Sequence, residues 1–228
     1  MENSLLKEAI VNNAQWCMRV WQSHDLESEK YEGLVYCPSE VPDFYPNIIT
    51  TQQGANKNER LISDLTVQNS SQNLSIKDSF AELDLASLNF KKLFDAHWLR
   101  FSNQLQNLQQ PNLSWRAVKS EQELENWERH WDEREGEVSR IFTDSLLKDP
   151  TVKFWSGYSI DNIQAGYISN ATGNVVGISN TFGSYKDCIH HAKTQFQHQP
   201  IVGYETGSSL EEAKDIDAEI IGDLTIWI

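Results

Sequence analysis

Residues 152–160 (VKFWSGYSI), 164–170 (QAGYISN) and 175–182 (VVGISNTF) are three runs rich in β-branched and aromatic residues. This composition is typical of β-strands. Residues 171–174 (ATGN), between the second and third runs, have the composition of a turn. The pattern therefore predicts three successive strands, of which the last two form a hairpin.

The remainder of the C-terminal region alternates helices with strands. Residues 185–196 have apolar positions at helical spacing, and residues 201–205 (IVGYE) follow as a short strand. We expect a second short helix at 209–216 and a closing strand at 219–228 (EIIGDLTIWI). This order predicts an α/β (α+β) fold class, with a mixed, mostly antiparallel sheet flanked by helices.

Composition and charge limit the classes of function. The chain has 228 residues, of which 39% are hydrophobic, and a formal net charge of -14. Such an acidic surface repels phosphate backbones, so nucleic acid is not an expected partner. The widely spaced Cys17, Cys37 and Cys188 indicate neither a metal site nor a disulfide framework. The N-terminal sequence does not resemble a signal peptide and no apolar run could span a bilayer, so we expect a cytoplasmic protein without membrane contact.

The first half of the chain has weaker patterns. Residues 5–24 carry an apolar stripe at helical spacing, and 33–51 look extended and contain three prolines. Residues 52–60 (QQGANKNER) are polar and predict a loop, whereas 61–67 fit either a strand or a short helix. Residues 75–101 alternate between strand-like and helix-like patterns.

A change of composition marks the expected boundary between the halves. Residues 102–112 (SNQLQNLQQPN) are rich in glutamine and asparagine and bury little apolar surface, which predicts a linker. We therefore expect an N-terminal half at 1–112 and a C-terminal domain at 113–228. Both halves end with a strand, a short helix and an aromatic-rich strand. An internal duplication would explain this, and so would the tendency of any α/β chain to repeat such a unit.

The order of elements over 114–228 resembles the acyl-CoA-binding core of the GNAT acyltransferase superfamily. In that family a first strand and two helices precede three antiparallel strands. Here the first strand corresponds to 115–118, the helices to 120–147, and the three strands to the runs quoted first. The resemblance of the N-terminal half is one of outline only, as an eroded GNAT-like half.

The resemblance implies how acetyl-CoA or another acyl-CoA would bind. In the family the third antiparallel strand splays from a parallel neighbour, which here would be 201–205. Exposed backbone groups of the splayed strand then bind the pantetheine arm as an added strand would. The corresponding residues of this chain are Asn180, Thr181 and Phe182.

The family binds the pyrophosphate of CoA with a glycine-rich loop that leads into a helix. Glycines let the backbone approach, and free amides at the helix N-terminus face the anion. At the corresponding place this chain has Gly183 and Ser184, and Lys186 supplies one positive charge. The arginine and the paired glycines of the family are absent, and Asp187 opposes an anion.

Candidate proton-transfer residues follow the same strand. The family often uses a tyrosine after the fifth strand as the general acid, and residues 208–221 contain none. The resemblance therefore leaves Tyr204 and Glu205 as the nearest candidates. Glu205 could act as a base, directly or through water, if burial raised its pKa toward neutrality. The alternative is a glutamate in solvent or one paired with a backbone group.

Two functions of different class follow from these residues. The first is a GNAT-like acyltransferase that moves an acyl group from acyl-CoA to an amine of a small molecule or peptide, without a metal. The second is a catalytically silent GNAT-like module that binds a ligand or a protein partner. Homodimerisation is left open by the sequence.

Other features predict structure rather than chemistry. His190 and His191 point about 100° apart on a helix, which does not suit a metal site, so we expect them on the helix surface. We expect Cys188 to be a buried thiol rather than a nucleophile.

Aromatic residues gather in two further segments. Residues 43–47 (DFYPN) either wall a pocket at the junction of the halves or plug the core between them, and the second interpretation is favoured. Residues 121–147 are expected to be mostly helical and broken at Gly136. Trp127 and Trp131 would lie on the buried stripe, and the acidic opposite face would be in solvent.

Overall fold

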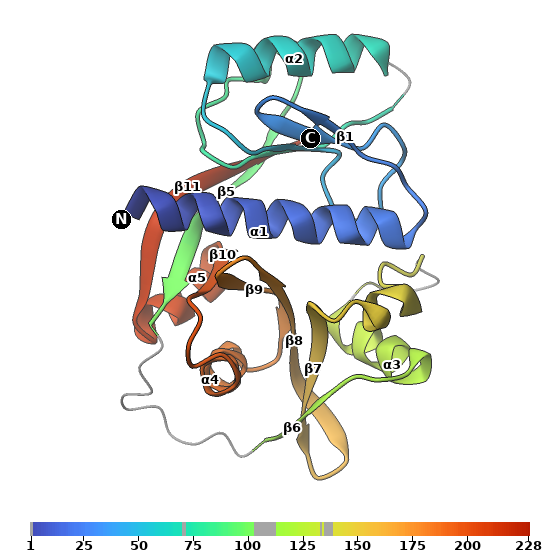
Figure 1. Cartoon of the computed structure of the whole chain (residues 1–228), viewed down its shortest axis with the longest axis vertical. Coiled ribbons are helices and arrows are strands. Elements are labelled where there is room, and N and C mark those ends of the chain that lie inside the picture. Colours follow the sequence, from blue (N-terminus) through green and yellow to red (C-terminus); the bar gives the residue numbers. More distant parts are fainter. Residues whose placement is uncertain (1, 70–71, 103–112, 133, 135–138) are drawn as a thin grey trace. The chain divides into compact units, whose positions relative to one another are not determined.

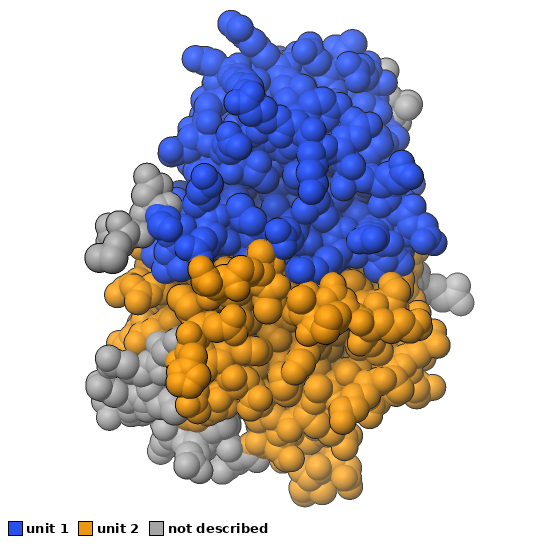
Figure 2. Space-filling view, in the orientation of Figure 1, with its two compact units in different colours: residues 1–98, 221–228 blue, residues 99–220 orange. Residues whose placement is uncertain are grey.

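A computed structural model describes residues 2–69, 72–102, 113–132, 134 and 139–228. The chain forms two compact units, shown in Figure 2. Unit 1 contains residues 1–98 and 221–228, and unit 2 contains residues 99–220. This grouping does not test whether 1–112 and 113–228 are related halves, so the duplication stays a prediction. Most of the expected linker at 102–112 and the expected break at Gly136 lie outside the described residues.

Unit 1 is a sheet with two long helices. Helix α1 has a buried stripe that includes Ile10, Trp16 and Val20, which confirms the helix expected from the apolar spacing. In chain order, the elements that begin in unit 1 are α1 (Glu2–Ser23), β1 (Glu29–Tyr31), β2 (Leu34–Tyr36), β3 (Ile48–Thr50), α2 (Ala55–Gln68), β4 (Ile76–Asp78), the 3-10 helix η1 (Ala86–Leu88) and β5 (Lys92–Phe101).

The strand order in unit 1 is β1-β2-β3-β4-β11-β5. Strands β1, β2 and β3 pair antiparallel, and β3 pairs parallel with β4. Helix α2 makes the crossover that a parallel pair requires. Strand β11 (Ala218–Trp227) returns from the end of the chain and pairs antiparallel with β4.

The expected polar loop at 52–60 is wrong, because α2 begins within it at Ala55. The helix buries Asn58, Ile62 and Leu65 on one face. Polar residues in its first turns therefore reflect solvent exposure rather than a loop, and the segment 61–67 is helical.

Unit 2 begins with the end of β5 and contains the region from which the fold class was predicted. The strands expected at 152–160, 164–170, 175–182 and 201–205 are all present within a few residues of their expected ends. The elements that begin in unit 2 are β6 (Ser114–Ala117), α3 (Glu121–Trp131), the 3-10 helix η2 (Asp144–Lys148), β7 (Val152–Ser159), β8 (Asn162–Thr172), β9 (Val175–Phe182), α4 (Tyr185–Gln195), β10 (Ile201–Glu205), α5 (Gly207–Asp215) and β11.

The strand order in unit 2 is β6-β7-β8-β9-β10, and the end of β5 lies beside β10. Strands β6 to β9 pair antiparallel, and β9 pairs parallel with β10 (Figure 1). The mixed, mostly antiparallel sheet flanked by helices is therefore confirmed. In each unit, the strand beside the parallel pair is distant in sequence from that pair: β11 lies beside β4 in unit 1, and the end of β5 lies beside β10 in unit 2.

Helices cover both faces of the sheet in unit 2. Consecutive residues of β7 point to opposite faces. The ring of Phe154 packs 5.2 Å from Trp127 of α3, whereas the ring of Trp155 packs 4.9 Å from His191 of α4. Helix α3 therefore covers one face, and α4 covers the other.

The acidic face expected in solvent on α3 needs a correction. Glu128 is buried, and its carboxylate accepts hydrogen bonds from the backbone amides of Ile141 (2.6 Å) and Phe142 (3.2 Å). The guanidinium of Arg140 donates to the same carboxylate at 2.9 Å. These hydrogen bonds attach residues 140–142, which precede η2, to α3, and they satisfy the buried carboxylate of Glu128.

Within the described residues, no helix combines the length and the apolar composition that crossing a membrane requires.

Candidate functional site

The parallel pair β9–β10 is joined over a short distance only. The ladder pairs Val176 with Ile201 and Gly177 with Val202. Strand β9 continues for five more residues, to Phe182, and β10 continues for three, to Glu205. The ends of the two strands therefore extend beyond their ladder. This matches the splay that the resemblance implies.

A β-bulge lies in the part of β9 beyond the ladder. Phe182 pairs with Gly166 and Ser179 pairs with Ile168, so Asn180 and Thr181 together oppose a single residue of β8. Asn180 has a φ of 52°, in the left-handed region. A bulge bends its strand and redirects the backbone. The predicted pantetheine-binding residues thus lie at a backbone irregularity.

The turn into α4 is tightly packed. Gly183 has a φ of 72°, and a Cβ added there would lie 2.0 Å from the carbonyl oxygen of Gln164. The Ser184 hydroxyl caps the helix by accepting a hydrogen bond from the Asp187 amide at 3.2 Å. Lys186 is exposed in the first helical turn. The helix N-terminus and one ammonium group are thus available near the end of β9, with Asp187 opposing them.

Glu205 ends β10 in a half-buried position. The pKa of its carboxyl group is raised to about 7, chiefly by burial; a hydrogen bond from Tyr185 lowers this pKa, and the negative charge of Glu212 raises it. A carboxyl group with such a pKa exchanges protons readily near neutral pH. The structure therefore favours a buried, hydrogen-bonded carboxyl group over a glutamate free in solvent.

Comparisons with known proteins bear on this arrangement. No protein-family model and no curated protein match the sequence. Among solved structures, a GCN5-related N-acetyltransferase from Kribbella flavida is similar, with a TM-score of 0.67 and 9% identity over 97% of this chain and 94% of that chain. A putative acetyltransferase of the GNAT family from Novosphingobium aromaticivorans has a TM-score of 0.53 and 8% identity, over 88% and 89% of the two chains. The chain has the GNAT fold.

A conserved protein of unknown function from Staphylococcus epidermidis is also similar, with a TM-score of 0.64 and 10% identity over 89% of this chain and 93% of that chain. Identities this low show the fold alone. The GNAT fold of this chain accounts for the parallel pair and for the helix that starts after β9. The roles of individual residues rest on their geometry.

The side chains of Tyr204 and Glu205 lie on opposite faces of β10. Adjacent residues of a strand point to opposite faces, so the side chain of Tyr204 points away from the face of Tyr185 and α4. The ring of Phe182 packs 5.3 Å from Trp127 on the α3 side. A Cβ on Gly166 would lie 2.4 Å from that ring, which explains the glycine. The structure brings together Glu205 and Tyr185, a residue that the sequence did not single out.

The expectation that His190 and His191 lie on the helix surface is wrong, because both are buried. The His191 ring stacks on Trp115 at 4.6 Å, and Nδ1 lies 2.8 Å from the Tyr167 hydroxyl. Burial lowers the pKa of His191 to about 4, so its ring is neutral at neutral pH. Cys188 is buried as expected, and burial raises the pKa of its thiol.

Unit 1 contains a pocket lined by the DFYPN segment. The pocket has a volume of about 470 Å³, and its wall includes Asp43, Phe44 and Tyr45. Phe44 is 65% exposed with a φ of 68°, whereas Tyr45 is buried and packs 6.3 Å from Trp16. The segment therefore walls a pocket of unit 1. The favoured interpretation of an aromatic plug between the halves is wrong for Phe44, which is exposed, whereas Tyr45 is buried against Trp16 within unit 1.

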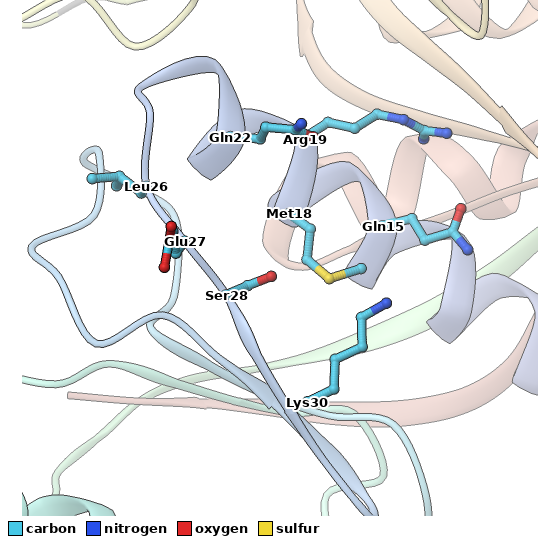
Figure 3. Close-up of a pocket in the computed structure, with 8 residues that line it drawn as sticks. All are labelled: Gln15, Met18, Arg19, Gln22, Leu26, Glu27, Ser28 and Lys30. Atoms are coloured by element: carbon cyan, nitrogen blue, oxygen red, sulfur yellow. The ribbon is translucent and has the colours of Figure 1, made fainter.

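A further pocket of unit 1 has a volume of about 520 Å³ and lies between α1 and the segment 26–30. Figure 3 shows Ser28 and Lys30 extending toward Met18 across this space. None of its lining residues belongs to the predicted site.

Proposed function

We propose that unit 2 catalyses transfer of an acyl group from acetyl-CoA, or another acyl-CoA, to an amine of a small molecule or peptide. The observation that carries this proposal is the short parallel ladder of β9 and β10, with a half-buried carboxyl group at the end of β10 whose pKa is about 7. The backbone of Asn180, Thr181 and Phe182 would hold the pantetheine arm. Gly183, Ser184 and Lys186 would face the pyrophosphate.

The chemistry is direct aminolysis of a thioester. The acceptor amine forms a C–N bond to the thioester carbonyl carbon and the C–S bond breaks. Glu205 takes the amine proton, directly or through water, and the CoA thiolate takes a proton from solvent or from Tyr204. A carboxyl group with a pKa near 7 is half ionised at neutral pH, so it can accept a proton and release it again.

The residues present fit the pantetheine arm better than the pyrophosphate. The end of β9 extends beyond its ladder with β10, and strand backbone of this kind can accept an added strand. The first turn of α4 has a single lysine beside Asp187, and the Ser184 hydroxyl already caps the Asp187 amide. These features support the second candidate, a catalytically silent GNAT-like module that binds a ligand or a protein partner.

Titration calorimetry of the full chain with acetyl-CoA separates the two candidates. The transferase proposal expects micromolar binding that weakens about tenfold in Lys186→Glu, because the variant brings a negative charge to the pyrophosphate. Lys57→Glu at the start of α2 in unit 1 is the matched control and should bind like the parent chain. Failure to bind any CoA ester at millimolar concentration would contradict the transferase and support the silent module.

The acceptor and the cellular setting belong to the same proposal. The acidic charge of the chain is consistent with an enzyme of the cytoplasm that acts on small-molecule or peptide amines, and not on nucleic acid. A screen of amine acceptors with acetyl-CoA, followed by release of free thiol, tests the acceptor class. Sedimentation of the full chain tests homodimerisation.

A further inference from the structure

A row of three paired residues crosses unit 2 on the face that α3 covers. Phe154 of β7 pairs with Ile168 of β8, and Ile168 pairs with Ser179 of β9. Directly paired residues of antiparallel strands point to the same face. The ring of Phe154 packs 5.2 Å from Trp127 of α3, so all three side chains of the row lie on the α3 face.

The hydroxyl of Ser179 interrupts this apolar row. Its Oγ is shielded from solvent and has no hydrogen-bond partner among the residues that the structure describes. A buried hydroxyl without a partner destabilises a folded chain, whereas an apolar residue would continue the row of Phe154 and Ile168 without that cost. Such a group in a folded protein requires an explanation, and a role in binding or catalysis is one.

Ser179 lies beyond the ladder that joins β9 to β10. The ladder ends at the pair Gly177–Val202, and Ser179 is two residues further along β9. The bulge of Asn180 and Thr181 follows directly after it. The residue as a whole is half-buried, so this part of β9 is not enclosed by the protein. Ser179 is thus the neighbour of the backbone that would hold the pantetheine arm.

The proposed contacts follow one another along the chain in a fixed order. Gly183, Ser184 and Lys186 would face the pyrophosphate, and residues 180–182 would hold the pantetheine arm. The thioester is at the end of that arm away from the pyrophosphate. The next residue of β9 in this direction is Ser179, so the acyl group would lie beside its side chain.

We infer that the Ser179 hydroxyl is a catalytic hydrogen-bond donor, which binds the carbonyl oxygen of the acyl thioester and stabilises the oxyanion that forms when the amine attacks. This role rests on the proposed acyltransferase function and deepens it.

The hydroxyl acts without gaining or losing a proton. As the C–N bond forms, the π electron pair of the carbonyl moves to its oxygen, which accepts the hydrogen bond from Ser179 Oγ. When the C–S bond breaks, the electron pair returns to the carbonyl and the thiolate leaves. A donor that is fixed where negative charge develops, away from water, stabilises the transition state more than it stabilises the bound thioester.

The first test needs no ligand. A hydroxyl without a partner in the protein contributes no hydrogen bond to stability, so Ser179→Ala should melt at the temperature of the parent chain or above it. Ser156→Ala is the matched control, because Ser156 Oγ on β7 is also shielded and has no partner in the described part of the chain. If Ser179→Ala melted about 3 °C or more below Ser156→Ala, the Ser179 hydroxyl would have a partner within the protein, and the inference would be overturned.

The second test compares acetyl-CoA with CoA, which lacks the acyl carbonyl. In titration calorimetry, Ser179→Ala should bind acetyl-CoA about fivefold more weakly than the parent chain and should bind CoA equally well, because only acetyl-CoA offers the oxygen. Ser156→Ala should bind both ligands like the parent chain. In acyl-transfer assays, kcat of Ser179→Ala should fall about a hundredfold, because the hydrogen bond is strongest to the oxyanion.

These measurements distinguish failure of the inference from failure of the proposed function. A parent chain that binds no CoA ester at millimolar concentration contradicts the transferase, and the role of Ser179 is overturned with it. An active enzyme whose Ser179→Ala variant keeps the kcat of the parent chain and the same ratio of affinities for acetyl-CoA and CoA overturns the role of Ser179 alone.

Discussion

Unit 1 and unit 2 each contain a parallel strand pair joined through a helix. The two pairs differ in the side chains at their open end, the end where the strands continue beyond their ladder. The pair β3–β4 of unit 1 and the pair β9–β10 of unit 2 are each hydrogen-bonded through two residue pairs. In both units, antiparallel strands lie on one side of the pair and a strand distant in sequence lies on the other. This likeness of topology is what the proposed duplication would produce.

In unit 1 the open end is occupied by the protein's own side chains. The Thr50 hydroxyl accepts a hydrogen bond from the Ser79 amide at 2.8 Å, which ties β3 to the residue after β4. The buried carboxylate of Asp78 accepts from the amides of Phe80 and Leu83. At the start of α2, the Gly54 amide donates to Glu82 at 2.6 Å. A carboxylate of the protein thus already lies where a helix N-terminus attracts an anion.

In unit 2 the corresponding positions carry different residues. Ile178 follows the ladder on β9 where Thr50 follows it on β3, and Gly203 follows it on β10 in the place of Asp78. A Cβ on Gly203 would lie 3.0 Å from the carbonyl oxygen of Ile178, so glycine allows this close approach. Two residues after Gly203, β10 ends with the carboxyl group of Glu205. The difference shows why we assign a ligand to unit 2 and not to unit 1.

The largest expected effect is a loss of stability when Asp78, at the open end of the β3–β4 pair in unit 1, is replaced. Asp78→Ala leaves the buried amides of Phe80 and Leu83 without an acceptor, so we expect a loss of roughly 3 kcal/mol in the free energy of unfolding. Urea denaturation measures this loss. Asp84→Ala is the matched control, since Asp84 accepts from the Ala86 amide in solvent and its loss should cost less than about 1 kcal/mol. Equal losses in both variants would contradict the view that Asp78 closes the end of unit 1.

The second effect separates the units by their response to acid. The pKa of His191 is about 4 in the folded protein, below the ordinary value of 6.5. As the pH falls, the unfolded chain takes up this proton first, so unit 2 should lose roughly 2 to 3 kcal/mol between about pH 6.5 and 4. The described histidines of unit 1, His24 and His97, are not fully buried.

Hydrogen exchange resolved by segment measures this difference. The Glu205→Gln background is required, because ionisation of Glu205 changes the stability of unit 2 in the opposite direction over an overlapping pH range. Adding His191→Phe should remove most of the loss. If both units weakened equally with acid, the buried neutral histidine would not be the cause.

The smallest effect compares the two helix starts. Glu82→Gln removes the charge that the Gly54 amide faces in unit 1, and Ser184→Ala removes the cap of α4 in unit 2. Each should lower the free energy of unfolding by about 1 kcal/mol. Only the loss in Glu82→Gln should shrink at high salt, because only that contact involves a charge. A salt-independent loss in Glu82→Gln would show that its charge does not act on α2.

The sequence predicted unit 2 better than unit 1, for a physical reason. The long strands β7, β8 and β9 alternate or bury both faces over eight or more residues, which produces a clear pattern. The strands of unit 1 that precede β5 have three residues each, too short for any periodicity. Helix α2 was missed because its first turns are polar and Gly54 interrupts the pattern.

The sequence likewise singled out some residues of the candidate site and not others. Sequence pattern and the resemblance identified the segments at Asn180–Phe182 and Gly183–Lys186, and they identified Glu205 by elimination. They could not identify Tyr185, because its relation to Glu205 joins residues 20 positions apart through the fold. A tyrosine at a helix start carries no local signal of its partner.

The resemblance supplied the expected place where a ligand would meet β9. Local patterns alone determined the element order of residues 149–228 and the fold class. Those features depend on composition and on spacing over a few residues, and both are written along the chain. The tertiary structure decided that Thr50, Asp78 and Glu82 fill the open end of the β3–β4 pair. It also decided that the carboxyl group of Glu205 has a pKa near neutrality. Burial and hydrogen bonds between distant residues cause both, and these exist only once the chain has folded.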